Sequence, residues 1–234
     1  MNRLLAMLPP AVLQRLDGAA SLLTVGPGDV MLDAGEPVVD VYFPLDLVVS
    51  LDQTISHDVD SYAAGPGVAL VGPEGVIGLE ALLGNENSIN RATVRIGGRA
   101  WRLPAAAVRE EFGRAGVMHR LLLASADGLL GQSCAIGACE RVHSVRQRVM
   151  RWLLMFADRA PSDDIRLTHD ALSQLLGTRR ASITVAASQL QTDGLIAYQR
   201  GIITLRDRNR LEAGACKCYH EIKARYTFQF DGEY

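Results

Sequence analysis

Four side chains near residue 180 have the chemistry that binds the phosphates and bases of nucleic acids. They belong to Arg179, Arg180, Ser182 and Thr184. An arginine can hold a phosphate or bridge the O6 and N7 atoms of a guanine, and a hydroxyl group can donate to a phosphate oxygen. These side chains lie within about one and a half turns of a predicted helix, so together they could recognise DNA.

Two predicted helices and a tight turn must position these residues. Thr168 is a good N-cap for the first helix, whose apolar face consists of Ala171, Leu172, Leu175 and Leu176. Gly177 ends this helix, as expected where the backbone takes a positive φ. We expect the second helix to bury Ile183, Ala186, Ala187 and Leu190. A second helix presented in this way suits the major groove of DNA.

A hairpin signal follows the second helix. Gly194 ends that helix, and two β-prone runs, residues 195–198 and 202–205, flank Gln199-Arg200-Gly201. Beside a helix-turn-helix such a hairpin is a wing, and we expect Arg200 to contact DNA phosphates. The alternative interpretation is a small helical hairpin packed on a β-ribbon, with no role in DNA binding.

Charge is divided unevenly along the 234 residues. Residues 1–140 hold 9 Lys and Arg against 16 Asp and Glu, a net charge of −7, whereas residues 141–234 hold 15 against 10, a net charge of +5. A basic region attracts DNA and an acidic region repels it. The basic part of the chain coincides with the predicted helix-turn-helix.

Targeting signals are not apparent in the sequence. No apolar run reaches the length of a membrane span, and Pro9-Pro10 interrupts the N-terminal segment too early for a signal peptide. We therefore expect a cytoplasmic protein with no membrane partner. Reduced thiols are expected in that compartment at Cys134, Cys139, Cys216 and Cys218.

The N-terminal part predicts a β-domain. Between residues 18 and 104, turns rich in glycine and proline separate short apolar runs, which include residues 38–43, 47–51, 68–71 and 92–96. Strands at this spacing favour a β-sandwich or roll. His57, Asp58 and Asp60 are expected in a solvated β-turn rather than in a metal site.

Residues 105–142 predict a long helix. Its stripe of apolar and small residues includes Leu122, Ala126, Leu129, Ser133 and Ile136. This stripe could form a dimer interface or pack on the β-domain of the same chain. We expect a homodimer, because a helix-turn-helix normally reads DNA as a dimer. Another helix is expected from Val145 to Arg159.

These motifs resemble the Crp/Fnr family of bacterial transcription regulators over nearly the whole chain. The most specific are residues 141–148, which lead into Trp152-Leu153-Leu154, and the helix-turn-helix from Leu167 to Leu195. Supporting motifs are Pro27-Gly28-Asp29-Val30, Gly35-Glu36-Pro37 and the glycines at 72, 75 and 78.

The resemblance implies an α+β fold in four parts. Residues 1–114 would form a cyclic-nucleotide-binding-type β-roll, a double-stranded, jelly-roll-like β-helix, and residues 115–142 a dimerisation helix. A winged helix-turn-helix would follow in residues 143–220, and a C-terminal tail in residues 221–234. The implied partners are double-stranded DNA, a second copy of the chain and, for an activator, RNA polymerase.

The resemblance also implies roles for single residues. Arg180 matches the main base-reading arginine of the family, whereas Ala181 and Val185 replace an acidic and a basic reader. These departures imply a different target sequence, and both residues could offer only apolar contact, for example to a thymine methyl group. Thr168, Arg179 and Ser182 match positions that usually hold phosphates.

The ligand pocket of the family is matched only in part. Gly78 and Glu80 correspond to the glycine and glutamate that hold a ribose, but Leu79 stands between them. Arg91 corresponds to the arginine that holds a cyclic phosphate, and Ala92 replaces the neighbouring hydroxyl residue. Arg91 could be a phosphate clamp or a surface strand residue. We expect no tight binding of cyclic AMP, and the effector is unknown.

Other chemistry has weaker support. Cys134 and Cys139 do not share a helix face well, and Cys216 and Cys218 lie near His220, but a structural metal site usually needs four ligands. We therefore expect no metal or other cofactor. No catalytic constellation is apparent, so an enzyme with a regulatory β-roll is a distant hypothesis. The leading hypothesis is a DNA-binding transcription regulator, and the alternative is a cyclic-nucleotide- or metabolite-binding sensor with secondary DNA contact.

Overall fold

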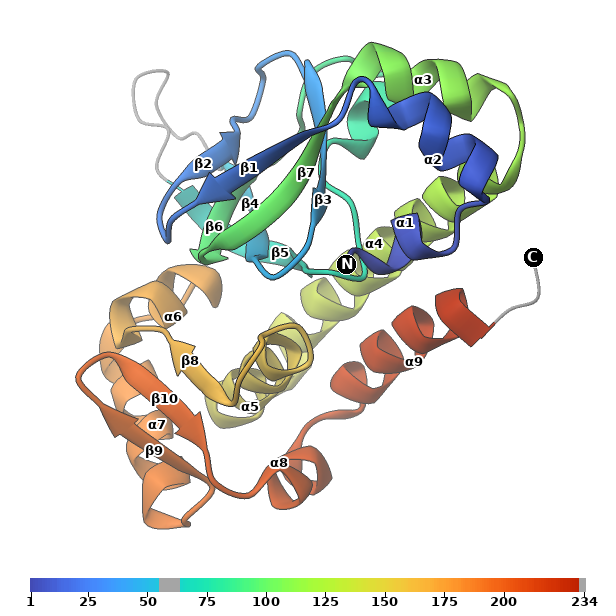
Figure 1. The fold of residues 1–234 in the computed structure, drawn as a ribbon. Coiled ribbons are helices and arrows are strands. Elements are labelled where there is room, and N and C mark those ends of the chain that lie inside the picture. The colour runs from blue at the N-terminus through green and yellow to red at the C-terminus, as the bar shows by residue number, and fades with distance from the viewer. Residues whose placement is uncertain (55–63, 232–234) are drawn as a thin grey trace.

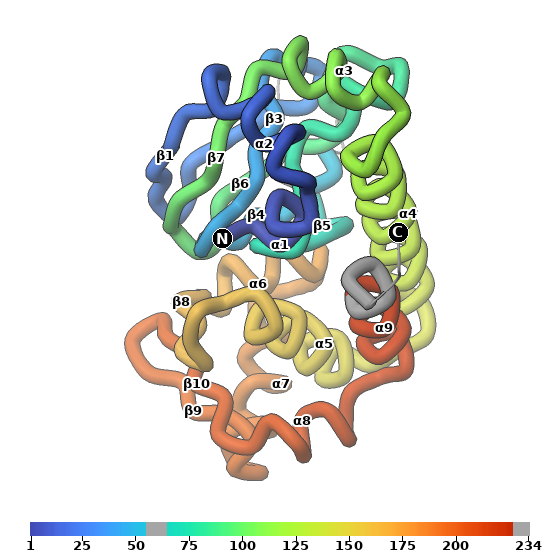
Figure 2. Tube along the Cα trace, turned by 45° about the vertical axis from the view of Figure 1, so that its right-hand side comes forward, coloured from blue at the N-terminus to red at the C-terminus, as the bar shows by residue number. Residues whose placement is uncertain are grey.

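The computed structural model describes residues 1–54 and 64–231, and the turn expected at residues 57–60 lies outside them. An N-terminal β-domain lies above a C-terminal domain of helices and a small sheet (Figure 1). The long helix α4 (Val117–Val142) runs from the first domain to the second, and the C-terminal helix α9 (Lys217–Asp231) lies along it (Figure 2). The α+β fold expected from the sequence is confirmed.

Two antiparallel sheets form the N-terminal domain. One has the order β1-β7-β3, with strands Ser21–Val25, Gly98–Pro104 and Asp40–Pro44. The other has the order β2-β6-β4-β5, with strands Val30–Leu32, Arg91–Ile96, Val48–Thr54 and Ala64–Val71. Short helices border the sheets: α1 (Arg3–Ala6), α2 (Pro10–Asp17), the 3₁₀ helix η1 (Leu79–Leu82) and α3 (Ala105–Gly113). The four apolar runs in the sequence correspond to β3, β4, β5 and β6.

The core of this domain lies between the two sheets and the helices that border them. Val41, Phe43, Val49 and Val94 are at most 1% exposed and belong to one hydrophobic cluster, together with Leu122 of α4. Burial of such side chains contributes about 1.5–3 kcal/mol each. The start of α4 is therefore anchored in the β-domain by hydrophobic packing.

The helix expected at residues 115–142 corresponds to α4, whereas the residues before it form the separate helix α3. The chain turns between α3 and α4, where Ala115 has a φ of 54°. Within α4, Leu122 and Ile136 are buried and Leu129 packs against the core of the β-domain. The large apolar residues that α4 exposes are Leu123, Leu130 and Val142. The stripe proposed from the sequence therefore faces the protomer's own interior to a large extent, and a neighbouring stripe faces solvent.

By length and composition α4 could also cross a membrane, since it has 26 residues and a mean hydropathy of 1.3 in its most apolar window. From the sequence we expected no segment long and apolar enough to span a membrane. Such a helix is weak evidence for a membrane span, because a helix packed inside a domain passes the same test. Here α4 contacts β5, α3 and α9 of the same chain.

The C-terminal domain begins with a capped helix. Ser144 caps α5 (Val145–Ala157): its Oγ accepts from the N–H of Gln147, and the Gln147 side chain accepts from the N–H of Ser144. The elements that follow are β8 (Asp164–Arg166), α6 (His169–Leu175), α7 (Arg180–Thr192), β9 (Ile196–Gln199), β10 (Ile202–Leu205) and α8 (Arg208–Gly214). The sheet order β8-β10-β9 contains the hairpin expected as a wing.

The C-terminal tail expected from residue 221 is instead part of α9. This helix packs along α4: a Cβ added at Gly131 would lie 2.7 Å from the Arg225 side chain, and Tyr226 Oη lies 2.5 Å from Gln132 Nε2. Gln132 also accepts from the N–H of Leu70 and donates to its carbonyl, at 3.2 and 3.1 Å. The contacts that anchor α9 are distant in sequence, so local patterns did not predict it.

A buried ion pair joins the two domains. Arg159, which follows α5, donates from Nε to Glu74 of the β-domain at 2.6 Å, and the two side chains are 3% and 7% exposed. Gly72 permits this approach, because a Cβ there would lie 2.9 Å from the Arg159 side chain. The guanidinium also lies 4.6 Å from the ring of Tyr226. The β-domain, α5 and α9 therefore meet at one charged contact.

Candidate nucleic-acid interface

The turn between α6 and α7 has the geometry that the sequence indicates. Thr168 caps α6 by accepting from the N–H of Ala171 at 3.1 Å. Gly177 has a φ of 55°, which a glycine adopts without steric cost. Ile183, Ala186, Ala187 and Leu190 of α7 are all buried, as expected. The packing of these four residues therefore fixes which face of α7 is exposed to solvent.

The side chains expected to read DNA lie on this exposed face. Arg180 has 68% of its side chain exposed, and its Nε lies 3.3 Å from Asp170 Oδ1. Ala181 is exposed, and Val185 is 58% exposed. An exposed arginine can form hydrogen bonds with base-pair edges in a groove, and an exposed apolar side chain beside it can contact a thymine methyl group.

The residues expected to hold phosphates surround this face. Arg179 is exposed at the N-cap position of α7, and Ser182 is half-buried one turn further on. Arg200 is exposed at the tip of the wing with a φ of 51°, followed by Gly201 with a φ of 79°. The hydroxyl of Thr168 is already engaged as a helix cap, so it can contact DNA only while keeping that role.

His169 and Tyr198, which the sequence did not single out, form a stacked pair next to α7. The ring of His169 stacks on Tyr198 of β9 with centroids 4.2 Å apart, and its Nδ1 lies 3.2 Å from Thr184 Oγ1. Thr184 in turn donates to the carbonyl of Arg180 at 3.1 Å. Burial, and then the charge of Arg180, lower the pKa of His169, so the ring is neutral at pH 7. The Thr184 hydroxyl is therefore engaged within the domain, although the residue itself is exposed.

A groove beside α7 carries another arginine. Arg146 of α5 lines it together with Ser144, Ala181, Val185 and Gln189. The guanidinium pairs with Asp193 at 2.7 Å and keeps 32% of its side chain exposed. Arg146 lies in the segment that resembles the Crp/Fnr family, yet only the folded chain places it next to α7.

Comparison with known proteins decides the identity of this domain. Residues 147–213 match the family model of the Crp-like helix-turn-helix domain. The C-terminal domain is a Crp-like helix-turn-helix domain. This match confirms the helix-turn-helix and the resemblance of this part of the chain to Crp-like proteins.

Solved structures extend the likeness in fold to more than four fifths of the chain. FixK2 from Bradyrhizobium japonicum has a TM-score of 0.70 and 21% identity, and the match covers 84% of this chain and 98% of FixK2. TTHB099, a transcriptional regulator from Thermus thermophilus, has a TM-score of 0.67 and 20% identity over 82% of this chain and 96% of its own. No protein of the curated set matches the sequence.

The residues that correspond to the family's ligand pocket lie in the β-domain of this Crp/Fnr fold. Gly78 has a φ of 92° and packs so closely that a Cβ would lie 3.0 Å from the carbonyl oxygen of Asp40. The Oε1 of Glu80, at the start of η1, lies 3.4 Å from the Ser88 hydroxyl. Ala92 is fully buried in the core. Of these three residues, only Glu80 could offer a polar side chain to a ligand.

Arg91 is already paired within the protein. Its Nε and Nη2 atoms donate to the two carboxylate oxygens of Asp33 at 2.9 and 2.7 Å. The hydrogen bond from Arg91 lowers the pKa of Asp33. Because a bidentate pair uses the two best-placed donors of the guanidinium, Arg91 would have to leave Asp33 to hold a phosphate.

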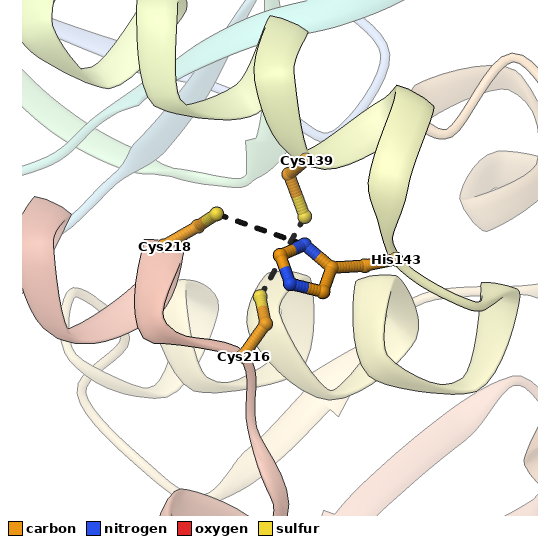
Figure 3. Close-up of side chains that lie close together, drawn as sticks. All are labelled: Cys139, His143, Cys216 and Cys218. Carbon is orange, nitrogen blue, oxygen red and sulfur yellow. Dashed lines mark hydrogen bonds between the residues drawn. The ribbon is translucent and has the colours of Figure 1, made fainter.

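One further cluster contains residues that could hold a metal. The ligating atoms of Cys139, His143, Cys216 and Cys218 all lie within 4.8 Å of one another (Figure 3). From the sequence we expected no metal site, because Cys139 does not share a helix face well with Cys134, which is exposed, and because Cys216 and Cys218 with the nearby His220 supply too few ligands. A spacing of four residues between Cys139 and His143 was the missed signal, since residues four apart lie on one helix face.

Proposed function

We propose that the protein is a cytoplasmic transcription regulator that binds a palindromic site on double-stranded DNA as a homodimer. The observation that carries this proposal is the exposed face of α7, on which Arg180, Ala181 and Val185 are open to solvent. A helix of this kind enters the major groove with its N-terminal residues against base edges. We assign no enzymatic activity, and a regulator that activates would also contact RNA polymerase.

Arg180 is assigned to base reading. Within residues 1–54 and 64–231, its guanidinium forms one ion pair, an exposed pair with Asp170, and exposed pairs contribute at most about 1 kcal/mol. A bidentate contact to a guanine is worth about 1–3 kcal/mol, so DNA can displace the carboxylate. Ala181 and Val185 would contact thymine methyl groups, and Arg179, Ser182, Thr168 and Arg200 would position the protein on phosphates.

The dimer interface is assigned to the exposed face of α4. Leu123 is 42% exposed and Leu130 is 65% exposed, seven residues apart and therefore on one side of the helix. Cys134 is also exposed on this helix. Two copies of this face would bury apolar surface that a single protomer leaves in water.

A signal in the β-domain has a physical route to the DNA-binding face. Gly67 of β5 touches the other domain so closely that a Cβ would lie 2.9 Å from Leu175 of α6 and from Trp152 of α5. Pro66 lies against Gly177, the turn glycine. A movement of β5 would therefore change the position of the turn that presents α7.

The test of DNA reading is binding-site selection followed by titration against salt. We expect one inverted-repeat motif and an affinity that falls steeply with the logarithm of salt concentration, since phosphate contacts release counterions. Selection that returns no motif with wild-type protein would contradict the proposal. An unchanged motif with Arg180→Ala would contradict the role of Arg180.

The test of the dimer is sedimentation equilibrium of Leu130→Glu. Unpaired charges in an apolar interface are strongly destabilising, so we expect this variant to be monomeric at low micromolar concentration. The matched control is Leu83→Glu, because Leu83 is 54% exposed but lies outside α4. A Leu130→Glu variant that remains fully dimeric would exclude this face as the interface.

A further inference from the structure

We propose that Cys139, His143, Cys216 and Cys218 form a mononuclear zinc site that joins the end of α4 to the start of α9. The four residues come from two segments that are more than 70 residues apart in sequence. Cys139 lies in α4, His143 is the C-cap of that helix, Cys216 directly precedes α9 and Cys218 lies in its first turn. Figure 3 shows their side chains converging on one point.

The distances fit a single tetrahedral metal ion. The Sγ atoms of Cys139 and Cys216 are 3.6 Å apart, and Cys218 Sγ lies 3.8 Å from His143 Nδ1. Zinc–sulfur bonds of about 2.3 Å at tetrahedral angles place two thiolates roughly 3.8 Å apart. In an iron–sulfur cluster the four ligands are shared among two or more iron atoms, and ligands on different irons are spaced more widely than the 4.8 Å that contains all four ligating atoms here. Three cysteines and one histidine are a set typical of structural zinc.

The site is closed and its thiols are reduced. Cys139, Cys216 and Cys218 are 0%, 3% and 9% exposed. The Sγ–Sγ separation of 3.6 Å is far longer than a disulfide bond. All four positions of a tetrahedron are filled by protein atoms, as in structural sites, whereas a catalytic site keeps one position open.

The surrounding charges favour an anionic metal centre. Arg151 is fully buried, and its Nη2 atom pairs with Glu140 Oε1 at 3.0 Å. Glu140 also pairs with Arg148, so this group of three carries one excess positive charge. Zn²⁺ with three thiolates and a neutral histidine carries one negative charge, which would balance it. This charged group lies beside the site, since Glu140 directly follows Cys139 in α4.

The position of the site gives the metal a structural role. α5 begins at Val145, two residues after His143, so the zinc would fix the junction between the helix of the β-domain and the DNA-binding domain. The same ion would hold the start of α9, whose Tyr226 reaches Gln132 and Arg159. Because structural zinc contributes folding free energy, removing it should loosen this junction.

Metal analysis of the purified full-length chain tests the site. We expect one zinc ion per protomer, retained through gel filtration and lost in Cys139→Ser, Cys216→Ser and Cys218→Ser. The matched controls are Cys134→Ser, an exposed cysteine of the same helix, and His220→Ala, an exposed histidine of α9; both should keep the zinc. Loss of zinc from a control as readily as from the cluster variants would overturn the assignment.

Cobalt titration of metal-free wild-type protein keeps the test independent of variants that fail to fold. We expect the d–d bands of tetrahedral Co²⁺ with thiolate-to-cobalt charge transfer, saturation at one equivalent, and displacement by Zn²⁺. We also expect the metal-free protein to unfold at a lower temperature. An octahedral spectrum without charge transfer, iron with inorganic sulfide, or a Cys139–Cys216 disulfide in protein purified without oxygen would each overturn the proposal.

Discussion

Arginine–carboxylate pairs in the β-domain and on the DNA-binding face differ in their exposure. Arg91 forms a bidentate pair with Asp33, and only 22% of its side chain is exposed. Arg180 touches Asp170 through one contact of 3.3 Å, and 68% of its side chain is exposed. The first arginine is committed to the fold and the second is available to a ligand. The resemblance to the Crp/Fnr family implies a ligand role for both arginines, so residue type alone does not decide function.

The largest expected effect tests a third pair, which is buried between the domains. Glu74→Gln would leave Arg159 as an unpaired buried cation, and breaking such a pair costs about 3–5 kcal/mol. We expect a loss of this size in the free energy of unfolding, measured by urea denaturation. Glu86→Gln is the control, because Glu86 and Arg109 form an exposed pair worth at most about 1 kcal/mol. Equal losses in the two variants would remove the distinction between buried and exposed pairs.

The next prediction concerns cyclic AMP. We expect isothermal titration calorimetry to give a dissociation constant in the millimolar range or weaker, because Arg91 must leave Asp33 and Ala92 supplies no hydroxyl donor. The difference from micromolar binding is about 4 kcal/mol. Gel shifts should show the same DNA affinity with and without the nucleotide. Low-micromolar binding that alters DNA affinity would restore Arg91 and Glu80 as ligand residues. It would also contradict the contrast between Arg91, which is committed to Asp33, and Arg180, which is available to a ligand.

Arg180→Ala should have an intermediate effect, confined to DNA specificity. We expect a loss of about 1–3 kcal/mol of discrimination at one base-pair position, measured by competition among operator variants. Arg200→Ala is the contrasting variant, since a phosphate contact should weaken all sequences alike and reduce the salt slope by about one unit. If both variants weakened all operators equally, Arg180 would be a phosphate contact.

The smallest expected effect is at the carboxylate that Arg180 touches. Asp170→Asn removes a competitor for the guanidinium and a negative charge near DNA, so affinity should rise by less than about 1 kcal/mol. Fluorescence anisotropy with a labelled operator can measure this change. Asp193→Asn offers a comparison, because Asp193 pairs with Arg146 beside the same helix. A fall in affinity on Asp170→Asn would show that the carboxylate orients Arg180 rather than competing for it.

Local patterns determined much of this protein. The period of apolar residues and Gly177 located α6, α7 and the turn between them, because helix spacing and positive φ are properties of a few consecutive residues. The four apolar runs similarly located strands β3 to β6. Arg180 and Arg200 were assigned to the DNA face by the same local reasoning, and the structure places both in solvent.

Only the tertiary structure decided which charged and ligating side chains meet. Asp33 and Arg91, Glu74 and Arg159, and the cluster of Cys139, His143, Cys216 and Cys218 each join segments that are far apart in sequence. The sequence also predicted an apolar stripe on the helix that is α4, but it did not indicate which face of this helix the protomer would bury. Such pairings depend on how whole elements pack, and no local period or propensity carries that information.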